Sequence, residues 1–195
     1  MHILENVFVW SQFRRMLDLF GNLYQRRFAL IREFGISPCA SVLDVGCGTG
    51  QYSQITDGDY LGIDMDPGYI QSASRKYRAP KRQFKCRALQ QIDLAEKKFD
   101  AALLIDLSHH LPKADFHNLL ASLTRIVSGH IILTDPLRQN RINLWGRMLT
   151  ALDRGNFIRS KEEELSIVRD HCDVVQAETM HFWGVQNIMI FAKTR

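Results

Sequence analysis

The stretch Val42-Leu43-Asp44-Val45-Gly46-Cys47-Gly48-Thr49-Gly50 decides the fold. A short run typical of a β-strand leads directly into a turn in which every second residue is glycine. Glycine permits a tight turn and lets a ligand approach the backbone, because no Cβ stands in the way. A helix after the turn would present free backbone N–H groups at its start. The stretch therefore predicts a strand followed by a ligand-binding turn.

Two well-known nucleotide-binding turns do not match this stretch. A dinucleotide-binding turn has the pattern Gly-x-Gly-x-x-Gly, and Gln51 stands where its third glycine is required. A Walker loop needs Gly-Lys followed by Ser or Thr, which is absent. The next predicted strand ends in Asp64, eighteen residues after Gly46. An acid at this position can accept the two hydroxyl protons of a ribose, at about 1.5–3 kcal/mol per bond. Because dinucleotide and other adenosine binders share this spacing, Asp64 alone does not discriminate between them.

The remaining segments alternate between strand-like and helix-like patterns, which favours a parallel sheet with helices on both faces. An apolar stripe predicts helix over residues 4–34, which Gly21-Asn22 can divide, and Ser160 with Glu163 forms a capping box that opens a helix ending near His171. Two strands separated by Trp183-Gly184 must form an antiparallel hairpin. The predicted strands are 41–45, 60–64, 83–86, 99–107, 130–134, 174–182 and 185–192, and the other predicted helices are 68–77, 116–127 and part of 144–152.

Residues 41–66, which contain the glycine turn and the segment Gly-Ile-Asp-Met-Asp, resemble motifs I and II of class I S-adenosylmethionine-dependent methyltransferases. The resemblance is close to the type 11 branch, which includes quinone-biosynthesis methyltransferases. Residues 99–111 are similar to the fourth motif of that branch, and residues 131–136 to its fifth strand. The resemblance implies an α/β, Rossmann-like fold with a seven-stranded, mostly parallel sheet. Its last strand would be antiparallel and inserted between strands five and six.

A single methyltransferase domain over residues 1–195 follows as the expected organisation. It would comprise an N-terminal helical cap (1–38), a cofactor-binding core (39–136), an insertion (137–159), and a closing helix and hairpin (160–195). The cofactor would be S-adenosylmethionine, with S-adenosylhomocysteine as product.

The same resemblance implies roles for individual residues. Asp44 would help to place the amino-acid end of the cofactor, and Asp64 would hold its ribose. The residues expected around the cofactor are Asp44, Gly46, Cys47, Gly48, Gly50, Asp64, Met65, Ala88, Leu89, Asp106 and Leu107. One position departs from the family pattern, because Arg87 stands where an acid often accepts the adenine amino group. Arginine cannot accept a hydrogen bond, so either the backbone of Ala88 and Leu89 reads the adenine or the alignment is shifted there.

Methyl transfer depends chiefly on aligning the acceptor, and a base is needed only for an acceptor that must first lose a proton. The candidates for that base are His110, His109 and Asp106. The alternative is that one of the histidines caps the strand or packs under the next helix. Adjacent histidines do not have the spacing of metal ligands on a helix, so no metal is predicted.

The acceptor pocket is expected to form from the N-terminal helices and residues 137–159. An aromatic stripe (Trp10, Phe13, Phe20 and Tyr24) can either pack on the sheet or cover an organic substrate as a lid. Phe157 and Arg159 resemble a loop segment that faces the active site in the type 11 branch. Arg159 can pair with an acidic group of the substrate or lie in solvent.

Charge and composition limit the classes of partner that the protein can have. The net charge is only +4, but seven basic residues and no acid fall between Arg75 and Arg87, and six basic residues face one acid between Arg138 and Lys161. Such runs either attract nucleic acid or lipid headgroups or form solvated surfaces.

We predict a small-molecule methyltransferase that acts on an O, N or C atom. The alternatives are a methyltransferase of RNA or another anionic polymer and a non-catalytic S-adenosylmethionine-binding protein. With no apolar run long enough to span a bilayer and no signal sequence, a cytoplasmic monomer or homodimer is expected. The four cysteines are scattered, which fits a reducing compartment.

Overall fold

The computed structural model describes residues 23–34, 36–37, 40–91, 99–152 and 155–195. Most of the N-terminal stripe, namely Trp10, Phe13 and Phe20, therefore lies outside the described residues, as do Gly21-Asn22 and Cys39. The helix predicted over 4–34 is described only at its C-terminal end, as α2 (Leu23–Glu33).

Seven strands form one sheet in the order β3-β2-β1-β4-β5-β7-β6. The first five run parallel to one another, and β7 is antiparallel to both of its neighbours, β5 and β6. The strands are β1 (Val42–Val45), β2 (Tyr60–Asp64), β3 (Arg82–Cys86), β4 (Phe99–Ile105), β5 (Val127–Pro136), β6 (Cys172–Phe182) and β7 (Val185–Thr194). The predicted seven-stranded, Rossmann-like sheet with its antiparallel C-terminal hairpin is confirmed.

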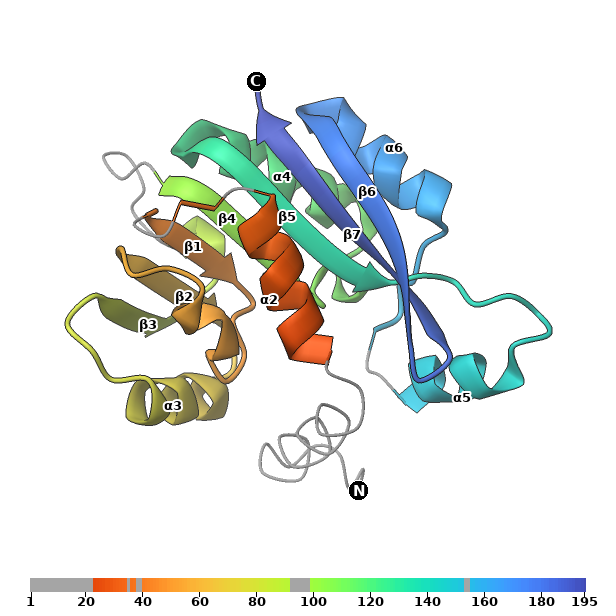
Figure 1. The fold of residues 1–195 in the computed structure, drawn as a ribbon, viewed down its shortest axis with the longest axis horizontal. Coiled ribbons are helices and arrows are strands. Elements are labelled where there is room, and N and C mark those ends of the chain that lie inside the picture. The colour runs from red at the N-terminus through yellow and green to blue at the C-terminus, as the bar shows by residue number, and fades with distance from the viewer. Residues whose placement is uncertain (1–22, 35, 38–39, 92–98, 153–154) are drawn as a thin grey trace.

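Helices cover both faces of this sheet (Figure 1). On one face α4 (Lys113–Ile126) and α6 (Lys161–His171) cover a core that includes Leu43, Leu104 and Leu133. On the other face α2 packs against a second core that includes Val42, Leu103 and Phe191. Alternate residues of β1 and β4 thus enter opposite cores, which explains why both strands are almost entirely apolar. The other α-helices in the described part of the chain are α3 (Pro67–Lys76) and α5 (Leu144–Leu152).

Two of the differences from the sequence prediction concern the segment after the glycine turn and the start of β5. The segment after the glycine turn is a single turn of 3₁₀ helix, η2 (Gln51–Gln54), rather than an α-helix. Only nine residues separate Gly50 from Tyr60 at the start of β2, which leaves little room for a longer helix and its return. The helix predicted over 116–127 runs instead from Lys113 to Ile126, and the chain continues directly into β5. Gly129 is therefore a strand residue, and its close approach to the Asp100 carbonyl leaves no space for a Cβ.

The capping box of α6 is confirmed. The Ser160 hydroxyl accepts a hydrogen bond from the Glu163 N–H, and the Glu163 side chain accepts one from the Ser160 N–H. No helix in the described part of the chain is long and apolar enough to cross a membrane.

Candidate functional site

The glycine turn lies at the carboxyl end of β1, between the ends of β2 and β4. Gly46, Gly48 and Gly50 all have positive φ, at 73°, 52° and 78°. A Cβ at Gly50 would lie 2.8 Å from the Phe84 ring, whereas a Cβ at Gly48 would meet nothing within 4 Å. Gly50 is therefore required by packing, and Gly48 leaves open space above the backbone.

The N–H groups of the turn are used within the protein. Gly46 and Cys47 donate to the Ile63 carbonyl at 2.8 and 3.0 Å, Gly48 donates to the Asp64 side chain, and Gly50 donates to the Cys47 carbonyl. These four N–H groups are therefore already bonded within the protein, and the prediction of free N–H groups concerns the residues that follow them. What the turn offers a ligand is space rather than hydrogen-bond donors.

Asp64, at the end of β2, is brought directly against this turn. Its Oδ2 accepts the Gly48 N–H at 2.9 Å and its Oδ1 accepts the Asp66 N–H at 2.9 Å. Burial raises the pKa of the Asp64 carboxyl, although the N–H donors of Asp66 and Gly48 oppose that rise. Each carboxylate oxygen can still accept a second hydrogen bond. Asp64 is thus oriented by the backbone and retains capacity for the two hydroxyls of a ribose.

Asp44 lies in the middle of β1 and is almost fully buried. Its Oδ2 accepts a hydrogen bond from the Tyr60 hydroxyl, with 2.5 Å between the two oxygens. Its Oδ1 has no hydrogen-bond partner among the described residues. Burial raises the pKa of Asp44 to about 7 against the lowering effect of the Tyr60 bond, and nearby Asp64 adds to the rise. A buried oxygen without a partner is costly, so this position favours a ligand or water that donates a proton.

The other residues expected around a cofactor divide into exposed and buried side chains. Met65 is 77% exposed beside Asp64, and Leu107 contacts the site where a Gly46 Cβ would stand. Leu89 belongs to the apolar core and the Cys47 thiol packs against Gly62, so these two can contact a cofactor only through their backbone. Arg87 comes directly after β3, and its N–H donates to the Asp64 carbonyl.

Asp106, at the end of β4, forms a bidentate ion pair with Arg27 of α2. Both Arg27 Nη atoms donate to its carboxylate at 2.8 Å, and the Arg27 side chain is almost fully buried. Burial would lower the pKa of Arg27, but the adjacent Asp106 charge raises it above its usual value. Asp106 also has a φ of 52°, which is uncommon for a residue with a Cβ. The pair fixes α2 against the end of β4 and ties the carboxylate to a buried guanidinium, which favours a positioning role over that of a base.

The two histidines differ in their surroundings although they are adjacent in η4 (Ser108–His110). His109 is buried, its Nδ1 contacts the Asp135 carboxylate, and its N–H donates to Asp135 at 2.9 Å. His110 is exposed, and its ring lies 4.1 Å from that of His109. A base role for either stays a prediction, and for His109 the geometry also matches the packed alternative.

A buried polar cluster surrounds His109 and was not expected from the sequence. The Ser108 hydroxyl lies between the carboxyls of Asp135 and Glu164, which it contacts on either side. Burial raises the pKa of Glu164 to about 7, and the Asp135 charge adds to this rise. A hydroxyl has one proton to donate, so a protonated Glu164 that donates to Ser108 would allow Ser108 to donate to Asp135. Asp135 and Glu164 gave no motif, because they come from β5 and α6.

Arg159 does not lie in solvent, so that alternative is wrong: the side chain is buried, and its guanidinium donates to the carbonyls of Ser108 and Leu111 at 2.9 and 2.6 Å. Its pairing with an acidic group of the substrate stays a prediction. The guanidinium also lies 3.7 Å from the Glu164 carboxyl and over the Phe116 ring. Arg159 is therefore part of the buried cluster. In the described residues no group of three His, Cys, Asp or Glu could hold a metal ion.

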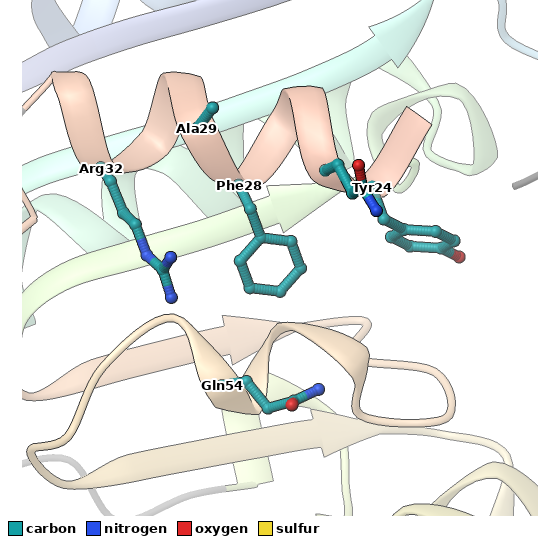
Figure 2. A pocket seen from close by; sticks show the side chains of 6 residues that line it. Tyr24, Phe28, Ala29, Arg32 and Gln54 are labelled. Atoms are coloured by element: carbon teal, nitrogen blue, oxygen red, sulfur yellow. The ribbon is translucent and has the colours of Figure 1, made fainter. Parts of the chain in front are cut away.

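A cavity of about 430 Å³ separates α2 from η2 (Figure 2). The described residues that line it are Tyr24, Gln25, Phe28, Ala29, Arg32 and Gln54, none of which belongs to the glycine turn. Phe28 stacks on Tyr52 at 5.2 Å, and Tyr24 is buried against the sheet core. The described end of the aromatic stripe thus packs on the sheet rather than standing free.

Comparison with known proteins agrees with this geometry. Residues 42–129 match the sequence profile of the family described as "Methyltransferase domain". Over this segment the chain is similar to class I S-adenosylmethionine-dependent methyltransferases, as its sequence motifs predict. The magnesium protoporphyrin IX methyltransferase of Synechocystis PCC 6803, solved with bound S-adenosylhomocysteine, has the same fold, with a TM-score of 0.71 over 89% of this chain and 83% of that one. Its sequence identity is 17%, so the likeness concerns the fold alone.

Two curated relatives share more of the sequence. A fatty-acid O-methyltransferase of Mycolicibacterium smegmatis is 30% identical over 115 residues, which cover 55% of this chain and 41% of the relative. A phthiotriol/phenolphthiotriol dimycocerosates methyltransferase of Mycobacterium ulcerans is 25% identical over 131 residues, covering 64% of this chain and 46% of the relative. The chain thus spans less than half the length of these relatives.

Proposed function

We propose that this methyltransferase domain transfers the methyl group of S-adenosylmethionine to an O, N or C atom of a small organic molecule. The observation that carries the proposal is the contact between Asp64 and Gly48. It joins an oriented carboxylate to an open glycine position at the carboxyl edge of the sheet. Ligands of open α/β sheets bind at this edge.

The residues fit the cofactor by their chemistry. Asp64 would accept hydrogen bonds from the ribose hydroxyls. The unpartnered Oδ1 of Asp44 would accept a hydrogen bond from the amino group of the cofactor, directly or through water. Gly48 would lie against the cofactor, because the space beside it is open and a side chain there would fill that space. Met65, which is exposed, would cover one face of the adenine, and the backbone at Ala88 and Leu89 would border its edge. When bound, the cofactor supplies a methyl group on a positively charged sulfur, which is already a strong electrophile.

The task left to the protein is orientation and the exclusion of water. Well-oriented reactions gain roughly 7–11 kcal/mol from positioning. Asp106 and Leu107 directly follow β4 beside the glycine turn, and the ion pair of Asp106 with Arg27 holds α2 over this end of the sheet. His110 is the residue to test as base, because it is exposed next to the buried His109–Asp135 pair.

The names of the curated relatives favour an apolar acceptor, such as a fatty acid or a lipid alcohol. Incubation with cofactor labelled in its methyl group should label a long-chain fatty acid or a phenolic lipid, and not RNA. Labelled RNA would favour the polymer alternative. Cofactor binding without transfer to any acceptor would favour the non-catalytic alternative.

The role of His110 is tested by His110→Ala. Affinity for S-adenosylhomocysteine should stay within about threefold of the wild type, a change of only ~0.65 kcal/mol. If His110 is the base, turnover should fall by roughly 10²–10⁴ and the acidic limb of the pH–rate profile should disappear. Turnover that persists with the same pH dependence would show that methyl transfer here needs only alignment.

A further inference from the structure

Exposed apolar side chains gather around α5. Eight large hydrophobic side chains are strongly exposed in the described part of the chain, and six of them lie in α5, in the segments that flank it or in the β6–β7 turn. We name these six the α5 surface: Ile142, Leu144, Trp145, Met148, Phe157 and Trp183. Ile142 and Leu144 are 87% and 71% exposed, so they contribute little to the core of the fold. Exposed apolar side chains gathered in this way indicate an interaction site.

The helix and the hairpin turn form one continuous surface. The Asn143 side chain donates to the Gly184 carbonyl at 2.5 Å, and Trp145 lies 3.0 Å from the position of a Gly184 Cβ. Figure 1 shows α5 beside the turn between β6 and β7, at one end of the molecule. Trp183 adopts a φ of 53° in this turn and remains 42% exposed. A left-handed backbone conformation is uncommon for a residue with a Cβ.

The same surface is positively charged. Between Leu137 and Leu152 the chain has three arginines, Arg138, Arg141 and Arg147, and no Asp or Glu. Arg138 pairs with Glu163 at 3.0 Å, whereas Arg141 and Arg147 form no ion pair with a described residue. Arg138 and Arg147 also line a cavity of about 320 Å³ that carries the polar side chains of Gln139, Thr150 and Asn156. Two guanidinium groups beside amide and hydroxyl groups suit a phosphate-bearing headgroup.

We infer that the α5 surface docks this protein on an anionic lipid membrane. The apolar side chains would enter the boundary between headgroups and acyl chains, the two tryptophans would lie at that boundary, and the arginines would pair with phosphates. Two other partners fit less well. A symmetric dimer through this surface would bring its arginines toward their own copies. RNA would leave the aliphatic side chains of Ile142, Leu144 and Met148 without bases to stack on.

The surface is connected to the candidate catalytic residues. The Phe157 N–H donates to the His109 carbonyl at 2.9 Å, and Gly155 is so close to the His109 ring that a Cβ would overlap it. Residues 155–157 therefore link the α5 surface to the end of β4. The purpose of docking rests on the proposed function, because a membrane-held lipid could then reach an acceptor site at that end.

Vesicle co-sedimentation of the full chain tests the inference. We expect binding to vesicles of phosphatidylserine mixed with phosphatidylcholine and much weaker binding to phosphatidylcholine alone. Arg141→Gln with Arg147→Gln should weaken binding by roughly 5-fold for each arginine removed. Leu144→Gln with Met148→Gln should weaken it by roughly tenfold or more, because it removes apolar area from the bilayer.

Matched variants elsewhere serve as controls. Arg125→Gln with Lys193→Gln removes two exposed charges from α4 and β7, and Val175→Gln removes an exposed apolar side chain from β6. These variants should bind vesicles within about twofold of the wild type. The inference is overturned if both vesicle types bind equally, if the controls weaken binding as much as the α5 variants, or if the α5 variants instead dissociate a dimer. Calorimetry with S-adenosylhomocysteine separates this result from the proposed function, since vesicle binding can persist or fail whether or not the cofactor binds.

Discussion

The glycine turn and the His109 cluster lie at the same edge of the sheet but are built in different ways. At the turn, Gly46, Gly48 and Asp64 come from two adjacent parallel strands, and their contacts leave open space. Around His109, side chains from η4, β5 and α6 are buried and bonded to one another. The first region leaves space for a ligand, and the second holds together the elements beside it. Changes in the first should therefore alter binding, and changes in the second should alter stability and its pH dependence.

Gly48→Val should have the largest effect on binding and so tests the open region most severely. A valine side chain would enter the space above the turn, and we expect cofactor affinity to fall by more than roughly 1,000-fold, or about 4 kcal/mol. Gly50→Val is the matched change, because its Cβ would meet Phe84 and Ala73 at 2.8 and 2.9 Å. Thermal unfolding should show a larger loss of stability for Gly50→Val than for Gly48→Val. A larger loss of stability for Gly48→Val would mean that Gly48 only shapes the turn and does not face the cofactor.

Asp106→Asn should destabilise the fold by about 3–5 kcal/mol, because it leaves the Arg27 guanidinium buried without its counter-charge. Removing both charges with Arg27→Met should restore part of that loss. A double-mutant cycle in urea measures the coupling free energy between the two side chains. Additive effects would show that the ion pair does not hold α2 in place.

Asp64→Ala should lower cofactor affinity roughly 30- to 1,000-fold, which corresponds to about 2–4 kcal/mol of lost binding. Asp66→Ala is the control two residues away. Asp66 caps α3 by accepting the N–H groups of Gly68 and Tyr69, so its loss should cost about 1 kcal/mol of stability with little effect on affinity. Calorimetry and thermal unfolding of both variants separate the two roles. Equal losses of affinity would contradict the assignment of the ribose to Asp64.

Glu164→Gln should have the smallest effect, and it should appear in the pH dependence of stability. The folded pKa of about 7 lies above the ordinary value of 4.5, so the stability that Glu164 contributes is fully present below pH 4.5 and is lost as the pH rises through 7. Glutamine can donate to Ser108 as the protonated acid would, at every pH. As the pH rises from 4.5 to 7, the free energy of unfolding of the variant should therefore increase by roughly 1–3 kcal/mol relative to that of the wild type. A constant difference across that range would show that Glu164 does not change protonation there.

The sequence predicted the sheet well because each strand carries its own local signal. The glycine turn, the apolar strand β4 and the Trp183-Gly184 hairpin are all recognisable within about ten residues. The sequence also brought Asp64 to the glycine turn, because parallel strands end at one edge. The short η2 in place of an α-helix was missed, although the nine residues between Gly50 and Tyr60 leave little room for a longer helix.

The residues that were missed belong to long-range contacts. From the sequence, Arg159 has the features of a solvated loop arginine. In the structure it is buried against the carbonyls of Ser108 in η4 and Leu111 directly after η4, and it lies near Glu164 of α6. Arg27 gave no signal because its partner Asp106 lies 79 positions away. A polar side chain in an irregular segment has no periodicity that reveals burial, so such clusters appear only once the elements are packed.

Calorimetric titration of S-adenosylhomocysteine into the full chain tests the central claim most directly, with NAD as the matched dinucleotide. We expect micromolar binding of S-adenosylhomocysteine, which Asp64→Ala should weaken at least roughly 30-fold, and no binding of NAD. Tight NAD binding, or S-adenosylhomocysteine affinity that is unchanged in Asp64→Ala, would contradict it.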